Sequence, residues 1–131
     1  MKRVAALAVI GVIGFLLALW RFGDAAAAHC QGTGQRDTTY SVEAGRLRME
    51  QIAHVLTVTR DGAPLTGARV CFNAEMKGMP AMAVSDEGRE VAPGRYEVSV
   101  TLGMRGDWTS VVLVEHDGRP RVAVPLDFRV G

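Results

Sequence analysis

The sequence predicts an all-β fold, an immunoglobulin-like antiparallel β-sandwich of about seven strands, preceded by an N-terminal signal or anchor helix. Three observations support this prediction. Apolar residues recur with a period of two in several short segments, turn residues separate these segments, and no helical period follows the apolar N-terminus. The roughly 100 residues that follow this N-terminus also match the size of one immunoglobulin-like domain.

The first element, residues 1–28, is typical of an export signal. Lys2 and Arg3 precede an uncharged apolar run over residues 4–20. As a helix this run would be about 26 Å long, so it could also just span a bilayer. Either the signal is cleaved after Ala28, which makes His29 the N-terminus, or it remains as an uncleaved anchor. Both interpretations predict a domain that is periplasmic or anchored to the inner membrane and facing outward.

The strand-like segments follow a polar lead-in, residues 29–45, and are predicted to form one sandwich over residues 46–131. The run at residues 55–59 is rich in β-branched residues and ends at the turn sequence Asp61-Gly62-Ala63-Pro64. Four alternating apolar residues then predict one buried strand face: Ala68, Val70, Phe72 and Ala74.

The later segments repeat this pattern. After the Pro93-Gly94 turn, apolar residues alternate on one face: Tyr96, Val98, Val100 and Leu102. Residues 108–115 are apolar on both sides, which predicts a central strand, and residues 122–130 form a period-2 stripe in which Pro125 indicates an edge strand. Three aromatic side chains are predicted to lie in the core: Phe72, Tyr96 and Trp108.

The two cysteines, Cys30 and Cys71, agree with export. In an oxidising compartment such a pair is more often a disulfide than a metal site or two reactive thiols. Closure of this loop would stabilise the fold by roughly 4 kcal/mol in the chain-entropy model. The alternative is that Cys71 serves as a thiolate ligand beside the methionines.

Composition and motifs argue against several classes of function. The formal net charge is +1 and the basic side chains form no run, so nucleic acid is not expected as a partner. The serines lack a nearby histidine and aspartate arrangement, and no phosphate-binding glycine loop is present. We therefore expect no enzymatic activity and no small-molecule substrate.

The methionines form the most unusual pattern in the chain. Met76, Met79 and Met82 lie within seven residues, and Met104 follows downstream. Gly78 and Pro80 exclude a helix over this stretch, which predicts a methionine-bearing loop. Clustered thioethers suit Cu(I), or they form an adaptable apolar contact surface; the simpler alternative is that each one packs into the core.

Several segments together resemble the YtkA-like domain family, which is similar to the periplasmic part of FixH-type proteins. The resemblance covers roughly residues 51–114 and is carried by Asp61-Gly62-Ala63-Pro64-Leu65-Thr66-Gly67-Ala68-Arg69-Val70, Gly78-Met79-Pro80-Ala81-Met82, Pro93-Gly94-Arg95-Tyr96 and Met104-Arg105-Gly106-Asp107-Trp108. It implies a small extracytoplasmic sandwich without enzymatic activity, associated with copper handling or with assembly of heme-copper oxidases. Met79 and Met82 match the family's M-P-x-M-x-M run, whereas Val84 replaces its last methionine.

Two candidate metal sites follow. In the first, Met79, Met82 and Met104, with Met76 assisting or substituting, bind Cu(I). In the second, a newly exposed His29 binds Cu(II) through its α-amine and imidazole, and other side chains complete the site: His54, His116, and Glu115 or Asp117. The rival hypothesis is a metal-free interaction module whose methionine surface contacts a membrane-associated protein partner.

Overall fold

The computed structural model describes residues 30–131, which contain nine strands and no helix. The predicted signal or anchor helix and His29 fall in residues 1–29, which lie outside the described residues. Within residues 30–131, no helix has the length and hydropathy needed to cross a membrane. The strands are β1 (Tyr40–Ala44), β2 (Ala53–Arg60), β3 (Ala63–Pro64), β4 (Arg69–Met76), β5 (Met79–Glu87), β6 (Arg89–Ala92), β7 (Arg95–Ser99), β8 (Gly106–Glu115) and β9 (Val122–Val130).

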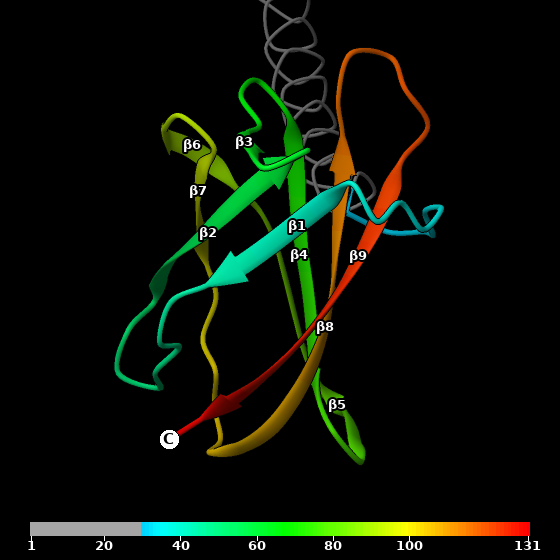
Figure 1. Ribbon diagram of the computed structural model, residues 1–131. Coiled ribbons are helices and arrows are strands. Elements are labelled where there is room, and N and C mark those ends of the chain that lie inside the picture. Colours follow the sequence, from blue (N-terminus) through cyan, green and yellow to red (C-terminus); the bar gives the residue numbers. More distant parts are fainter. Residues whose placement is uncertain (1–29) are drawn as a thin grey trace, which may run out of the picture.

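The strands form two antiparallel sheets that face each other (Figure 1). One sheet has the order β1-β2-β7-β6, with β3 paired to β2, and the other has the order β5-β4-β8-β9. The predicted all-β sandwich is therefore confirmed in its class. It has nine strands within residues 30–131, more than the predicted seven, because β1 lies in the predicted lead-in, β3 lies in the predicted turn at residues 61–64, and residues 79–92 form β5 and β6.

The core lies between the two sheets and contains the predicted aromatic residues. Phe72, Tyr96 and Trp108 are all fully buried, and the alternating valines around them point inward. Trp108 stacks on Phe128 of the neighbouring strand, with ring centroids 6.2 Å apart. Burial of each large apolar side chain contributes about 1.5–3 kcal/mol, so this interior accounts for most of the driving force for folding.

Strand positions within the second sheet follow the sequence pattern. Strand β8 is paired on both sides, with β4 and β9, as predicted for a central strand. Val112 and Val114 face the core, whereas on the outer face Leu113 is buried with the two cysteines and Val111 is 41% exposed. Strand β9 is at the edge, as Pro125 predicts, since proline cannot donate a ladder hydrogen bond. Within residues 30–131, an isolated bridge joins Gln35 to Val122 at the start of β9.

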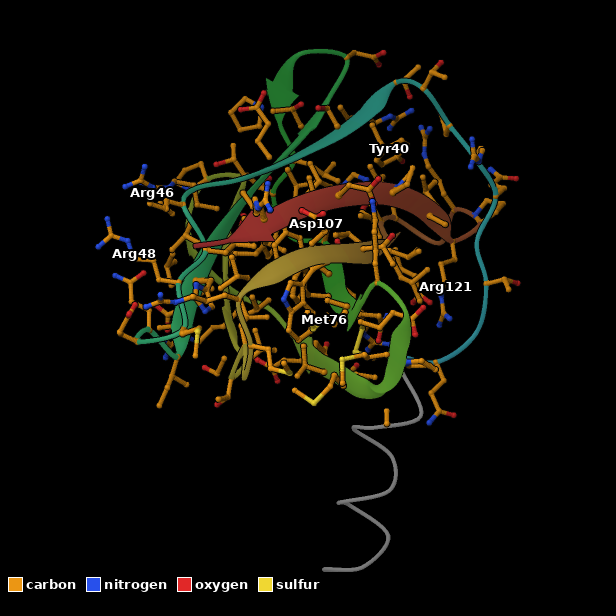
Figure 2. The ribbon with its side chains drawn as sticks, turned by 90° about the horizontal axis from the view of Figure 1, so that it is seen from below. Tyr40, Arg46, Arg48, Met76, Asp107 and Arg121 are labelled. Carbon is orange, nitrogen blue, oxygen red and sulfur yellow. A yellow bond between two sulfur atoms is a disulfide. The ribbon has the colours of Figure 1, made fainter. Side chains whose placement is uncertain are left out.

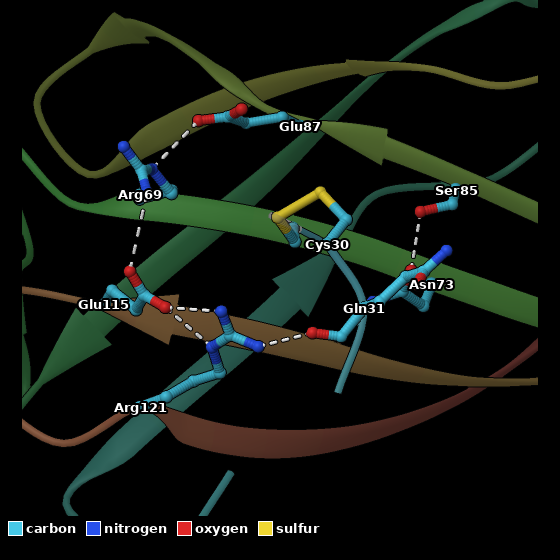
Figure 3. The surroundings of a disulfide bond; sticks show 9 residues. Cys30, Gln31, Arg69, Asn73, Ser85, Glu87, Glu115 and Arg121 are labelled. Carbon is cyan, nitrogen blue, oxygen red and sulfur yellow. Dashed lines mark hydrogen bonds and ion pairs between the residues drawn. A yellow bond between two sulfur atoms is a disulfide. The ribbon is translucent and has the colours of Figure 1, made fainter. Parts of the chain in front are cut away.

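The predicted disulfide between Cys30 and Cys71 is present, with Cα atoms 5.2 Å apart (Figure 3). Both cysteines are buried with Leu113 on the outer face of the second sheet. Beside them, Arg121 donates a 2.6 Å hydrogen bond to the Gln31 carbonyl. The disulfide and the Arg121–Gln31 hydrogen bond fix the beginning of the described chain to the sheet. A disulfide also favours an oxidising, extracytoplasmic location.

A network of ion pairs lies next to the disulfide and the Arg121–Gln31 hydrogen bond. Arg121 pairs with Glu115 at 2.6 Å, and Glu115 also lies 3.7 Å from Arg69, which in turn pairs with Glu87. These partners come from β4, β5 and β8 and from the turn before β9 (Figure 3). We call this end of the sandwich, where β4 begins and β8 ends, the closed end.

Candidate functional site

The methionines lie at the opposite end of the sandwich, where β4 ends and β8 begins. We call it the methionine end; Figure 2 views the molecule from this side, with Met76 and Asp107 labelled. Met76 is the last residue of β4 and Met79 the first of β5, and the two are paired across the hairpin. The turn between them is Lys77-Gly78, in which Gly78 adopts a φ of 78° that suits glycine.

The prediction that Met79 and Met82 lie on a loop is wrong, because both belong to strand β5. The ladder between β4 and β5 shifts between Glu75 and Met76, which leaves residues 80–82 without partners in β4. Such a bulge on an edge strand accommodates Pro80, which has no N–H to donate. Gly78 and Pro80 therefore exclude a helix, as expected, but they do not exclude an irregular strand.

Two of the methionines point toward the core. Met76 and Met82 are half-buried and pack against the main apolar cluster. Their terminal methyl groups reach the same connection between β7 and β8. A Cβ added at Gly106 would lie 2.9 Å from Met76 Cε, and a Cβ added at Gly103 would lie 3.2 Å from Met82 Cε. The two glycines thus leave room for the two methionines.

Met104 lies between these glycines. Its backbone carbonyl accepts a 3.1 Å hydrogen bond from the indole Nε1 of Trp108, which holds the connection against the core. Its side chain is 40% exposed, and that of Met79 is 42% exposed. The structure therefore brings Met76 and Met82 to the loop that carries Met104, while Met79 stands at the adjacent hairpin.

The two described histidines that were predicted to complete the Cu(II) site, His54 and His116, lie at opposite ends of the sandwich. His54 lies near the start of β2, faces the core and is only 4% exposed, whereas His116 follows the end of β8 at the closed end. His116 Nε2 pairs locally with Asp117 at 3.3 Å. Among residues 30–131, no three histidine, cysteine, aspartate or glutamate side chains are arranged to hold a metal ion. Cys71, in its disulfide, is not a thiolate ligand.

Burial sets the protonation state of His54 at neutral pH. Its Nε2 has no hydrogen-bond partner, and burial, which disfavours the charged imidazolium, lowers the pKa below the ordinary value of 6.5. Hydrogen bonding to the backbone at Gln51 and Val100 acts in the opposite direction. His54 is therefore a neutral core residue at the methionine end at neutral pH.

The sequence interpretation gave no role to the basic residues at this end. Arg46, Leu47, Arg48, Glu50 and Arg129, together with Gly131, line an open hollow of about 510 Å³. The available signal was the alternation of charged and apolar residues over 46–50, which falls in the predicted strand-containing region. This alternation alone does not predict the hollow, because the hollow also needs Arg129 and Gly131 from the distant end of the chain.

The fold and site define a disulfide-linked β-sandwich with thioether side chains gathered at one end. Comparison with known families matches residues 38–112 to the YtkA-like family, and the chain belongs to that family. The match begins before the predicted start at residue 51, so it includes β1 as well as all four methionines of this end.

No curated protein matches the chain. Among solved structures, a polysaccharide deacetylase from Bacillus cereus is similar over 70% of this chain, with 12% identity and a TM-score of 0.48. The chain spans about 30% of the length of that deacetylase.

Proposed function

We propose that this protein is a non-enzymatic, extracytoplasmic accessory domain that binds Cu(I) at its methionine end, in copper homeostasis or in the assembly of a heme-copper oxidase. The observation that carries the proposal is the approach of Met76 and Met82 to the loop containing Met104. Thioether sulfur is a soft ligand that suits Cu(I) and is a poor ligand for hard cations. Family membership supports the accessory role.

The arrangement suits uptake and release of a soft ion. Met79 and Met104 expose their side chains to solvent, so they would take the first contact with Cu(I). Met76 and Met82 are held by the core and would present their sulfurs from fixed positions. Because the thioethers carry no charge, the apo form pays no electrostatic cost for holding them close together.

A Cu(I) titration of the purified protein against a chromophoric chelator tests the proposal. We expect Met79→Leu combined with Met82→Leu to abolish Cu(I) binding without unfolding the domain, since leucine and methionine have similar volumes. Met49→Leu is a suitable control, because Met49 also packs against the core but is not part of the β4–β5 hairpin or the 103–106 loop. Retained binding in the double variant would contradict the assignment.

The second candidate function is a metal-free interaction module for a membrane-associated protein. It is favoured by the exposure of large apolar side chains at the same end, where Ile52 is 63% exposed in addition to Met79 and Met104. Methionine adapts to irregular partners, so this surface would suit protein contact without copper. Absence of Cu(I) binding by the unmodified protein would leave this function as the better proposal.

We also propose that the immunoglobulin-like sandwich is located in the periplasm, either released or tethered to the inner membrane through residues 1–28. Support comes from the charged and apolar pattern of that segment and from the disulfide. The intact mass of the protein recovered from cells distinguishes cleavage after Ala28 from retention of the anchor.

A further inference from the structure

We propose that the hollow lined by Arg46, Arg48 and Arg129 binds an acidic segment of a partner protein through that segment's carboxylates. This inference goes beyond the proposed copper function and does not depend on it. The hollow lies at the methionine end, where the β1–β2 connection meets the end of β9.

Two arginines are positioned by the core. In the β1–β2 connection, exposed and buried residues alternate, so that Leu47 and Met49 pack against the core while Arg46 and Arg48 stay on the solvent side. Leu47 is fully buried, which anchors the connection between the two guanidinium-bearing residues. Figure 2 shows Arg46 and Arg48 extending outward from the same edge of this end. The loop thus presents both side chains in one direction.

The third arginine is held in a similar way. Val130 is buried in the core at the end of β9, which leaves the preceding Arg129 on the outer side. The Nε atom of Arg129 lies 3.6 Å from Asp107 Oδ1, in an exposed ion pair. Exposed pairs of this kind are weak, so an incoming carboxylate competes with Asp107 at little cost.

The charges in the hollow are unbalanced. Three arginine side chains line it, and two carboxylates oppose them: that of Glu50 in the lining and that of Asp107, which pairs with Arg129. Within residues 30–131, neither Arg46 nor Arg48 forms an ion pair, so among the arginines of the hollow Arg129 alone already has a carboxylate partner. A guanidinium offers paired N–H donors that match a carboxylate in a bidentate arrangement. The hollow is therefore complementary to negative charge.

Its shape indicates the kind of anion. A small molecule is usually bound in a cleft that covers most of its surface, and an open hollow at the end of a sandwich does not provide such cover. A chain with several carboxylates can instead engage the arginines together. A membrane surface is disfavoured, because polybasic lipid-binding segments carry clusters of about 4–8 basic residues, whereas three arginines line this hollow.

The test uses the purified full chain and a fluorescent hexaglutamate peptide, measured by anisotropy at low ionic strength. We expect Arg46→Gln combined with Arg48→Gln to weaken peptide binding by about tenfold or more, since charge-assisted hydrogen bonds are among the strongest. The matched control is Arg95→Gln combined with Arg119→Gln, which removes the same charge at the closed end and should change binding by less than about twofold. Thermal unfolding verifies that both variants are folded.

Three outcomes would overturn the inference. Equal weakening by the two double variants would mean that only net charge matters. Equal displacement of the peptide by inorganic phosphate at the same charge concentration would mean a general anion site. If the protein binds phosphatidylglycerol vesicles but not the peptide, and the Arg46 and Arg48 double variant loses vesicle binding, the surface is a lipid site.

The Met79 and Met82 double variant separates this inference from the copper proposal. We expect it to bind the peptide as the unmodified protein does.

Discussion

The two ends of the sandwich are built from different kinds of interaction. At the closed end, directional hydrogen bonds from side chains satisfy backbone groups, both in the core and nearer the surface. The Tyr96 hydroxyl donates to the Leu65 carbonyl at 2.7 Å and accepts from the Ala68 N–H at 3.1 Å. Glu90 accepts from the N–H groups of Gly67 and Gly94, and the Gly67 bond lowers the pKa of the Glu90 carboxyl.

Within residues 30–131, the methionine end has fewer such bonds, and its two ion pairs, Lys77–Asp127 and Arg129–Asp107, are well exposed. Its connections are held by Leu47 and Trp108, and it leaves methionines, Ile52 and arginines at the surface. Buried hydrogen bonds and ion pairs have strict geometry, so they fix a structure, whereas thioethers and exposed arginines adjust to what they meet. The difference suggests that one end supplies stability and the other supplies contacts.

The largest effect should come from the disulfide at the closed end. We expect Cys30→Ser combined with Cys71→Ser to lower the free energy of unfolding by about 2–5 kcal/mol. Denaturant unfolding of the oxidised protein and the variant measures this difference. If the variant is as stable as the oxidised protein, the closed end does not supply the stability that we attribute to it.

Tyr96→Phe should have the next largest effect. The variant leaves the Leu65 carbonyl without its partner in a buried place, which should cost about 1–3 kcal/mol. Tyr40→Phe is a matched control, because no hydrogen bond of the Tyr40 hydroxyl is seen within residues 30–131 although this ring is also buried. Equal destabilisation by both substitutions would indicate lost packing rather than a lost hydrogen bond.

His54 should make stability depend on pH at the methionine end. Its pKa is lower in the folded protein than the unfolded value of 6.5, so below this value the unfolded chain binds the proton more readily. Stability should therefore fall as pH decreases through 6.5, before the Asp37 and Glu90 carboxyls, whose ordinary pKa values are 3.8 and 4.5, contribute.

Melting temperatures at about pH 7.5 and about pH 5.5 measure this effect, because histidine titrates between these values. We expect His54→Leu to remove most of the decrease. His116→Gln serves as the control, since His116 lies at the closed end and pairs with the exposed Asp117. A decrease that persists in His54→Leu would show that another group is responsible.

The smallest effect on stability is expected for the exposed methionines. Met79→Leu combined with Met104→Leu should change the free energy of unfolding by less than about 0.5 kcal/mol, because both residues are partly exposed and leucine has a volume similar to that of methionine. Denaturant unfolding measures this, and Met76→Leu provides a half-buried comparison. A large decrease in the free energy of unfolding of the Met79 and Met104 double variant would mean that the methionine end also contributes to stability.

Much of the fold could be predicted because its signals are local. Alternating apolar residues and turn sequences indicate strands, and the pairing of Cys30 with Cys71 follows from their number and compartment. Strand β5 was not predicted, because Gly78 and Pro80 are turn residues in most contexts and the bulge that accommodates Pro80 depends on β4. Strand β1 has the same alternation, with Tyr40 and Val42 buried, in a stretch that was assigned to the lead-in.

The candidate site was only partly predictable. The spacing of Met76, Met79 and Met82 is visible in the sequence, but their orientation is set by tertiary contacts. The contacts of Met76 and Met82 with Gly106 and Gly103 join β4 and β5 to a connection more than twenty residues away. The hollow likewise requires Arg129 to lie near Arg46, which is distant in sequence. This proximity follows from the antiparallel pairing of β9 with β8, which brings the end of β9 to the methionine end.

The attachment of Cys30 to Cys71 also determines how the domain responds to mechanical force. Tension applied to the chain at Cys30 passes through the disulfide directly to β4, so that β1, β2 and β3, which lie within the 41-residue separation, carry none of it. Strand β4 is hydrogen-bonded on both sides, to β5 and β8. The oxidised domain is therefore loaded at a central strand, whereas reduction would move the load to β1, an edge strand that can be peeled away one hydrogen bond at a time.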